Sequence, residues 1–573
     1  MIQELVEYGK RVTKGKCKAF CEESYTVVLA IDSEGTFKGL TPKEGSVKTA
    51  HITEHKEKGK IGMISAKQGH ARFLLDKSAE VLGDGKDAEK KHKTFITVLE
   101  RYKGVSAMNP VFAFYSKKEE LQKAVAAFHK LKAKDRSGNI TFMVGTQILL
   151  ENEEIKNAII SLYEKDEQRL KNGRICSMCG KSDSPVLDEP HGTVRMPKGQ
   201  TAGSALVSFN IPVFESYGLK GNMNSSICRD CARNYIEGLK SLLNDGHYEG
   251  EGDKQHYKYD HRVNISDNTV ALFWTQKETE FNPLILDNPP ESVEVRNLFG
   301  SVWSGESKVE SIVDSEMFYS CTLSSAAARI AVRDWTAISL EAYKKNIADW
   351  FKDIEILDIK GELVYTPLRL LIKATQRDPK AGEKRVSDLN SKARIGAILW
   401  NAAIKGYSYE IPIEVLQYIL NRLWKNNKFS LERATLIKLV INRNTNKNMK
   451  STLDKANTSV AYLCGRLFAV IESMQRKAMK GKVNSGVKER FFAAAASQPA
   501  YIFGTLLTKN VPIYQHKIEG YLANELKEIA GTISECGSFP QRFTPIEQGE
   551  FALGYYFQNT HKPNNEKEDS INS

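Results

Sequence analysis

The sequence contains no uninterrupted apolar run long enough to cross a lipid bilayer. Its richest stretch, residues 461–471, is broken by Arg466, whereas a membrane-spanning helix needs roughly 20 consecutive apolar residues. The first sixteen residues mix acidic and basic side chains and lack the apolar core of a signal peptide. Cysteine is scarce as well, with nine in 573 residues, which argues against a disulfide-stabilised secreted fold. These absences predict a cytoplasmic protein with no membrane partner.

Motifs of common catalytic sites are also missing. The chain has no phosphate-binding GxxxxGK[ST] loop, no HExxH, no GxSxG and no GxGxxG after a predicted strand. The composition, 41% hydrophobic and 27% charged, is that of an ordinary folded chain, and its length suffices for several domains. We therefore expect a multidomain protein that is not an enzyme.

The positive charge of the chain is concentrated in one segment. The formal net charge is +12, and residues 425–490 hold fifteen Lys and Arg against four acids, a local balance of +11. A cationic segment of this density is typical of proteins that neutralise phosphate backbones. The alternative is a set of lysine-rich helix faces exposed to water. Density alone favours nucleic-acid binding over that alternative.

Hydrophobic patterning predicts an α+β front half and a mostly α-helical back half. Strands are expected at 25–32 and 33–40, joined by a turn at Glu34-Gly35, and at 140–145, 268–274 and 318–324. Helices are expected at 73–82, 94–102, 119–134, 153–164 and 230–243, and over most of the chain after Ser324. The expected segments are an N-terminal α+β domain (1–170), a Cys-x-x-Cys segment (171–243), the rest of the α+β region (244–345) and a helical bundle (346–573).

Four of the nine cysteines form two Cys-x-x-Cys pairs. Cys176 and Cys179 are separated from Cys228 and Cys231 by a 48-residue insert. Two such pairs commonly supply four thiolates to one tetrahedral zinc ion. The second pair opens a predicted helix, whose N-terminus stabilises thiolate charge. The spacing predicts a structural zinc site resembling a zinc ribbon, and unmetallated packing cysteines are the alternative.

A zinc-stapled HNH-like nuclease is a second hypothesis for the same segment. Such enzymes use a histidine as general base beside a divalent metal at the scissile phosphate. His191 and Asn224 lie between or beside the cysteine pairs. However, His191 has no adjacent aspartate, and the residues after Cys231 lack a metal-binding histidine. We therefore expect no nuclease activity from this segment.

Distinctive motifs lie in and around the insert. They are the element CSMCG (176–180), the loop KGQTAG (198–203), LVSFN (206–210), FESYG (214–218) and NMN (222–224). Further pieces follow in order, including NTVALFW (268–274), AYLCGRLFAVIE (461–472) and GEFALGYYFQ (549–558). Together they make the chain resemble, over almost its whole length, the Csd-family large subunit of the type I-C CRISPR Cascade complex. Cys179 and the second cysteine pair depart from the usual family pattern, which makes a zinc staple a subgroup feature.

The resemblance implies a non-catalytic subunit of an RNA-guided surveillance complex. Such a subunit recognises the protospacer-adjacent motif (PAM) in double-stranded DNA, aids strand separation and R-loop stabilisation, and docks a helicase–nuclease, while guide pairing reads the target. The implied partners are double-stranded DNA, displaced single-stranded DNA, crRNA, and the backbone, 5′-handle-binding and small subunits. The resemblance also implies that residues 449–573 are similar to the Cascade small subunit.

Candidate DNA contacts follow from side-chain chemistry, because amides and guanidinium groups read base edges and cations bind phosphates. On the PAM side the candidates are Lys67, Gln68, Arg72, Lys198, Gln200, Asn210, Asn222 and Asn224. Along the strand path they are Lys450, Lys455, Arg466, Arg476, Lys477, Lys480 and Lys482. Taken singly, each polar residue is more often structural.

Overall fold

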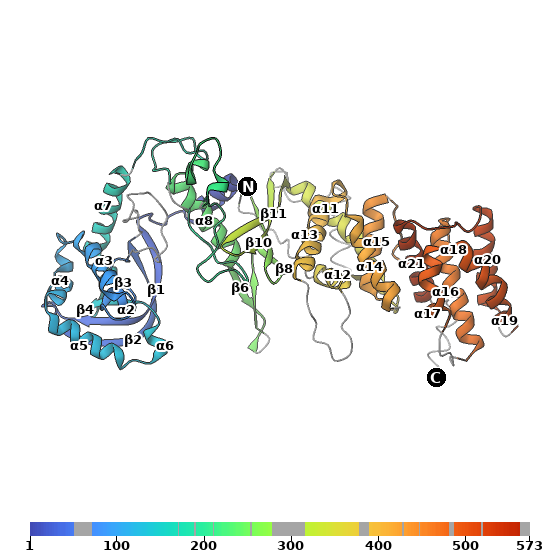
Figure 1. Ribbon diagram of the computed structural model, residues 1–573, viewed down its shortest axis with the longest axis horizontal. Helices are drawn as coiled ribbons and strands as arrows, with labels where there is room; N and C mark the ends of the chain where they lie inside the picture. Colours follow the sequence, from blue (N-terminus) through green and yellow to red (C-terminus); the bar gives the residue numbers. More distant parts are fainter. Residues whose placement is uncertain are drawn as a thin grey trace. The chain divides into compact units, whose positions relative to one another are not determined.

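The computed structural model describes residues 1–50, 71–169, 171–187, 191–209, 211–252, 255–277, 316–376, 389–426, 429–445, 447–480, 486–516 and 520–561. These residues form two compact units. Unit 1 comprises residues 1–245 and 325–331, and unit 2 comprises 246–324 and 332–573. The N-terminal region mixes strands and helices around a four-cysteine cluster, and the C-terminal region is mostly helical, as predicted (Figure 1).

A five-stranded mixed sheet organises the N-terminal part of unit 1. Its strand order is β2-β1-β4-β3, with β5 added beside β4. β1 pairs antiparallel with β2 and parallel with β4, in a register that sets Val27 opposite Ile140. Apolar side chains of β1 and β4 are buried on both faces, which keeps the pair in the centre of the sheet. The strands are β1 (Phe20–Ile31), β2 (Phe37–Ala50), β3 (Leu75–Asp76), β4 (Ile140–Val144) and β5 (Gln147–Ile148).

Helices of unit 1 pack around this sheet and beside the cysteine segment (Figure 1). The apolar side chains of the helices between residues 78 and 169 and those of the sheet form one continuous core. The helices and short 3-10 turns are α1 (Ile2–Val12), α2 (Ser78–Val81), α3 (Ala88–Glu100), η1 (Ser106–Met108), α4 (Asn109–Ser116), α5 (Lys118–His129), α6 (Ala133–Arg136), η2 (Leu149–Glu151), α7 (Glu153–Arg169), η3 (Pro212–Phe214), η4 (Gly221–Asn224) and α8 (Arg229–Asn244).

Unit 2 begins with antiparallel strands. Four of them form a sheet in the order β11-β10-β9-β8, and β6-β7 and β12-β13 are separate two-stranded hairpins. Every residue of β9 is buried, in keeping with its unbroken apolar sequence and its inner place in the sheet. The strands are β6 (Gly246–Glu249), β7 (His256–Tyr259), β8 (Arg262–Ser266), β9 (Thr269–Thr275), β10 (Met317–Ala326), β11 (Arg329–Ser339), β12 (Glu355–Leu357) and β13 (Leu363–Tyr365).

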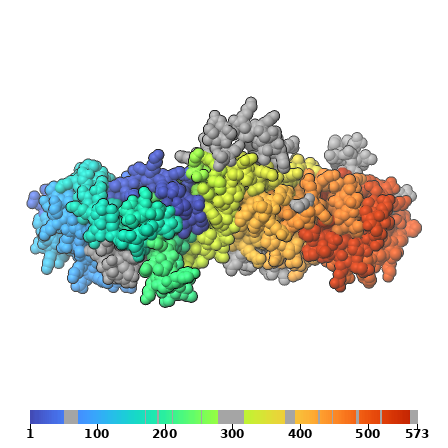
Figure 2. Space-filling model, turned by 90° about the horizontal axis from the view of Figure 1, so that it is seen from above, coloured from blue at the N-terminus to red at the C-terminus, as the bar shows by residue number. Residues whose placement is uncertain are grey.

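The remainder of unit 2 is helical. In Figure 2 this part runs from yellow to red, and its helices pack against one another. They are α11 (Leu340–Ile354), α12 (Leu368–Ala374), α13 (Leu389–Lys405), η7 (Gly406–Ser408), α14 (Ile413–Asn426), α15 (Leu431–Thr445), α16 (Val460–Ala478), α17 (Val487–Ser497), α18 (Pro499–Thr505), the π-helical η8 (Leu506–Asn510), α19 (Val511–Gln515), α20 (Tyr521–Glu535) and α21 (Pro545–Thr560).

A close crossing of α16 and α21 holds the C-terminal bundle together. Glycines stand at the contact: a Cβ on Gly465 would overlap the Phe551 carbonyl, and one on Gly554 would overlap the Tyr462 carbonyl. The predicted apolar stripe of α16, which includes Leu467, lies in the core of this bundle as expected. None of the described helices is long and apolar enough to span a membrane.

One secondary-structure prediction was wrong. Residues 73–82 form the short strand β3 and a single helical turn, because Leu75 and Asp76 pair with Thr141 and Ile140 at the sheet edge. A distant pairing partner overrode local helix preference there. The chain after Ser324 is mostly helical, as predicted, although β11 first returns beside β10 as an antiparallel strand. The hairpin of β1 and β2 and the strands at β4, β9 and β10 were predicted correctly.

Candidate metal centre and nucleic-acid contacts

The four cysteines of the two Cys-x-x-Cys pairs converge in unit 1. Their Sγ atoms all lie within 4.8 Å of one another, and the Sγ atoms of Cys179 and Cys228 are 3.9 Å apart. Four sulfurs around a tetrahedral zinc, each at about 2.3 Å from it, lie about 3.8 Å from one another. The cluster therefore has the size and the donor set of a metal site that uses all four ligand positions.

The first pair lies in a tight turn that aims its sulfurs inward. The amide of Met178 donates to Cys176 Sγ at 3.4 Å, and the amide of Gly180 donates to the Cys176 carbonyl at 2.9 Å. Gly180 has a φ of +70°, a left-handed conformation that glycine adopts without strain. This glycine explains why the turn closes immediately after Cys179.

The second pair lies at the N-terminus of α8. Cys228 is the N-cap residue, and its amide donates to Cys176 Sγ at 3.2 Å, which joins the two turns directly. A β-bridge between Val186 and Cys228 adds a backbone connection across the insert. The next residue, Arg229, is 1% exposed and forms an ion pair with Glu167. Breaking the cluster would therefore disturb the start of α8 as well as the loops.

Thiol acidity differs within the cluster. A hydrogen bond with the Cys231 thiol is the main cause that lowers the pKa of Cys228 to about 5. The same hydrogen bond raises the pKa of Cys231, and burial raises the pKa of Cys179. The opposite directions mean that this hydrogen bond stabilises the Cys228 thiolate and keeps the proton on Cys231. A bound divalent metal would displace the remaining protons, which couples metal affinity to pH.

His191 does not serve as a nuclease base in this structure. The side chain is fully buried, and its Nδ1 lies 3.0 Å from the hydroxyl of Tyr235. Burial lowers the pKa of His191 to about 4, so the ring is neutral at pH 7. A phosphate backbone could not reach it. The structure therefore gives no support to the HNH-like hypothesis, and His191 is better described as a packing residue of the segment.

The loop at 194–204 presents two of the predicted PAM-side residues. Lys198 and Gln200 are both exposed, and a β-bridge between Val194 and Ser204 closes the loop behind them. The hydroxyl of Ser204 donates to the Ala327 carbonyl at 3.0 Å, which fastens the loop to the segment 325–331 of the same unit. Arg195 is exposed on the same loop, although its side chain was not among the predicted contacts.

The loop at 211–224 is ordered by an asparagine side chain. Asn224 accepts a hydrogen bond from the Ser216 amide at 3.1 Å and donates to the carbonyls of Leu219 and Gly221, each at 2.9 Å. Asn224 therefore shapes the loop, and its amide is occupied there. Asn222 is 3% exposed and is equally internal. Asn210 lies outside the described residues.

Tyr217 at the tip of this loop was missed by the sequence reasoning. It is 99% exposed and has a φ of +52°, an uncommon conformation for an aromatic residue. The turn from Ser216 to Leu219, closed by a 2.9 Å backbone hydrogen bond, holds it there. The only signal in the sequence was the dipeptide Tyr217-Gly218, which indicates a turn without saying that the ring is exposed.

Arg72 is held by acidic neighbours. Its guanidinium lies 3.2 Å from Glu23 and 3.4 Å from Asp76, and its side chain is only 20% exposed. Its role in reading DNA stays a prediction, now weakened by these two ion pairs. Lys67 and Gln68 lie outside the described residues.

Four cations of the basic segment are buried, which corrects the charge argument. Arg466 is 1% exposed and lies between Glu525 and Gln558, so it does not face DNA as predicted. Three others are also interior and bond to residues elsewhere in unit 2: Arg433, Lys438 and Arg443. Because acids such as Asp353 lie outside residues 425–490, the +11 balance overstates the charge that the segment exposes.

The exposed cations of the segment divide into paired and unpaired groups. Lys450, Lys455 and Arg476 form ion pairs with Asp454, Glu525 and Glu472, at 2.7, 2.6 and 2.9 Å. Lys477 and Lys480, at the C-terminal end of α16, are exposed and have no ion-pair partner in the described part of the chain. Lys482 lies outside that part. The end of α16 is therefore one place in the described part of this segment that offers unpaired positive charge.

Comparison with known proteins identifies the family. The sequence model of the CRISPR-associated protein family Cas_Csd1 matches residues 5–562, which is nearly the whole chain. No curated protein matches the chain significantly. An α+β region with a four-cysteine cluster, followed by a helical bundle, is thus the architecture of a CRISPR-associated protein. The chain belongs to the Cas_Csd1 family.

Proposed function

We propose that this chain is the large subunit of a type I-C Cascade complex and that it recognises the PAM in duplex DNA. The observation that carries the proposal is the exposed pair Lys198 and Gln200 on a loop closed by the bridge between Val194 and Ser204, in the insert between the two cysteine pairs. Membership of the Cas_Csd1 family supports an RNA-guided setting. In that setting a few placed side chains suffice, because guide pairing reads the remaining sequence.

The chemistry of the two loops suits a short double-stranded motif. The Gln200 amide can both donate and accept at a base edge, while Lys198 and Arg195 can bind the flanking phosphates. Tyr217 offers an exposed ring for contact with a base or sugar beside them. Binding of this kind would favour local opening of the duplex, from which strand separation and R-loop formation proceed.

We propose that the four cysteines hold one structural zinc ion. Cys176, Cys179, Cys228 and Cys231 provide four sulfur donors at tetrahedral spacing, the donor set that zinc prefers. A site with four protein ligands leaves no position for a reactive water, so the ion would stabilise the fold around the loops. Metal analysis of the purified chain should find about one zinc per chain. A folded chain without metal would contradict this assignment.

The proposed role is non-catalytic and depends on cytoplasmic partners. These are crRNA, the backbone, 5′-handle-binding and small subunits, the displaced and target DNA strands, and a separate helicase–nuclease that docks on the complex. Supercoiled plasmid incubated with the purified chain and Mg²⁺ or Mn²⁺ should remain intact. Nicking that disappears in His191→Ala would overturn the non-catalytic role.

The decisive experiment uses reconstituted complex and duplexes that differ only in the motif beside the target. We expect one motif to bind at least tenfold more tightly, since one good base contact contributes about 1–3 kcal/mol of discrimination. Gln200→Ala should reduce that ratio, and Lys198→Ala should weaken binding to all duplexes alike. Lys130→Ala, which removes an exposed lysine at the end of α5, is the matched control. Equal affinity for every motif would contradict motif reading by this subunit.

A further inference from the structure

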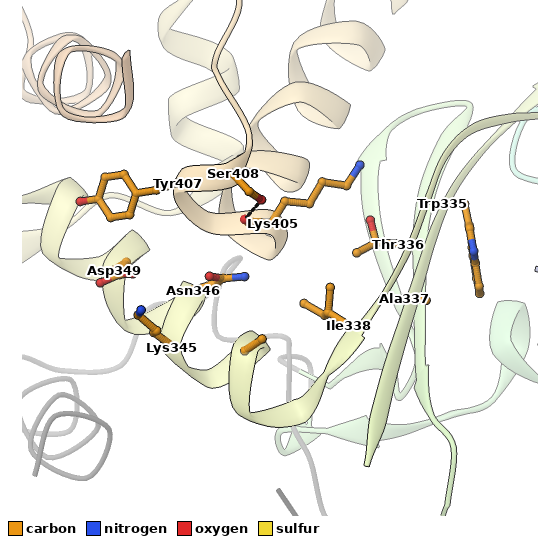
Figure 3. Close-up of a pocket in the computed structure, with 11 residues that line it drawn as sticks. Trp335, Thr336, Ala337, Ile338, Lys345, Asn346, Asp349, Lys405, Tyr407 and Ser408 are labelled. Carbon is orange, nitrogen blue, oxygen red and sulfur yellow. Dashed lines mark hydrogen bonds between the residues drawn. The ribbon is translucent and has the colours of Figure 1, made fainter. Parts of the chain in front are cut away.

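A pocket of about 580 Å³ lies within unit 2, in a region to which no function has been assigned above (Figure 3). Residues from the end of β11, one face of α11, the last residue of α13 and the turn η7 line it. Its volume is in the range that small ligands occupy in proteins. The residues that line it are Trp335, Thr336, Ala337, Ile338, Ala342, Lys345, Asn346, Asp349, Lys405, Tyr407 and Ser408.

Tyr407 provides a fixed aromatic surface at one end of the pocket. Its hydroxyl donates to Asp353 Oδ1 at 3.1 Å, and the guanidinium of Arg443 lies 4.5 Å from the ring centroid. Arg443 has a fully buried side chain and pairs with Asp353, so the support beneath the ring is rigid. Tyr407 is nevertheless 46% exposed. The ring is thus held from one side and open on the other.

Asp349 offers its carboxylate to the pocket. The residue is 5% exposed, and no hydrogen bond or ion pair joins its carboxylate to another described residue. Burial raises the pKa of Asp349. A ligand that brings an N–H group into the pocket could donate to this carboxylate.

Lysine side chains complete the pocket. Lys345 precedes Asp349 by one helical turn on α11, and Figure 3 shows Asp349 between it and Tyr407. Lys345 is exposed and has no ion-pair partner among the residues that the structure describes. Lys405, in contrast, is already paired with Asp334 at 2.8 Å. Lys345 is therefore the cation available to an incoming anion.

We propose that this pocket binds one nucleotide of a single-stranded nucleic acid, with its base on Tyr407, its amino group on Asp349 and its phosphate on Lys345. Stacking on aromatic rings beside a cation is the usual way in which proteins hold single strands. The Asp349 carboxylate accepts from an exocyclic amine, so cytosine fits and thymine, which presents a carbonyl at that position, does not. A cationic side chain of a protein partner could pair with Asp349 but would be repelled by Lys345.

The test uses the purified full-length chain and fluorescent oligonucleotides of about ten residues, a length typical of single-strand sites. Oligo-dC should bind more tightly than oligo-dT in fluorescence anisotropy. Tyr407→Ala should weaken binding of oligo-dC roughly 5- to 100-fold, whereas Tyr407→Phe should keep most of it because the ring remains. Tyr501→Ala, at a 73% exposed tyrosine on α18, is the control and should change nothing.

Two further variants separate the contacts. Asp349→Ala should remove the preference for dC over dT. Lys345→Gln alters only an exposed side chain and should lower the slope of log affinity against log salt by about 0.7, which keeps the proposal testable if Asp349→Ala misfolds. The proposal would be overturned if oligo-dC and oligo-dT bind with equal affinity and Tyr407→Ala leaves the affinity for oligo-dC unchanged. If free cytidine monophosphate binds as tightly as the oligonucleotide in a competition assay, the pocket takes a mononucleotide, and the proposal that it binds a strand is overturned.

Discussion

The cysteine segment of unit 1 and the basic helices of unit 2 present their polar residues in opposite ways. In the cysteine segment, loops between the two cysteine pairs carry exposed Lys198, Gln200 and Tyr217. In the basic helices, many cations point inward, where Arg466 and Arg443 meet buried carboxylates. The segment with the lower net charge therefore exposes polar side chains that a ligand could reach. In the segment with the higher net charge, many cations are already paired inside the protein. Local charge density alone is a poor guide to which surface contacts a ligand.

The largest expected effect comes from removing one thiol of the four-cysteine cluster that we propose to hold zinc. Cys228→Ala deletes the residue that joins both turns and caps α8. We expect the free energy of unfolding of unit 1 to fall by several kcal/mol, on the order of 5, because metal binding and folding are coupled. Thermal denaturation and protease cleavage within residues 171–231 measure it. Cys536→Ala, at an exposed cysteine, is the control, and identical melting of both variants would contradict a structural metal.

The next largest effect is expected from substituting a buried cation of α16, for comparison with an exposed cation at the end of the same helix. Arg466→Met should cost about 3–5 kcal/mol of stability, since it leaves Glu525 buried with one partner fewer. Lys477→Met should leave stability unchanged and lower the salt slope of DNA binding by about 1. Urea denaturation and binding at several salt concentrations check the pair. If Arg466→Met keeps its stability but binds DNA more weakly, then Arg466 contacts DNA, and the distinction between buried and exposed cations is wrong for this helix.

A pH titration tests the burial of another cation, Lys438 on α15. Burial lowers the pKa of Lys438 to about 8 from the ordinary 10.5. Between these values the unfolded chain binds more protons than the folded chain, so stability should rise as the pH increases from 8 to 10.5. The rise due to this residue is on the order of 3 kcal/mol. It should disappear in Lys438→Met and persist in Lys477→Met, as measured by urea unfolding across this pH range.

The sequence allowed the four-cysteine cluster to be predicted, because two Cys-x-x-Cys pairs in one chain commonly bring four sulfurs together. Strand β9 could be predicted as well, since its unbroken apolar run is recognisable without knowledge of the strands that pair with it. The burial of Arg443 was not predictable, because its partner Asp353 lies on another helix 90 residues earlier in the chain. Likewise, only the folded loop reveals that Asn224 is occupied and Tyr217 exposed.

The smallest expected effect distinguishes a residue that shapes a loop from one that reads DNA. Asn224→Ala removes three hydrogen bonds within the loop at 211–224 and should cost about 1–2 kcal/mol locally. Gln200→Ala removes an exposed side chain and should leave stability unchanged. Motif discrimination should fall in both variants, in Asn224→Ala because the loop with Tyr217 loses its shape. Hydrogen exchange of residues 211–224 and duplex binding separate the two causes. If Asn224→Ala loosens the loop while motif discrimination stays intact, then only the loop at 194–204 reads the motif, and Tyr217 plays no part in it.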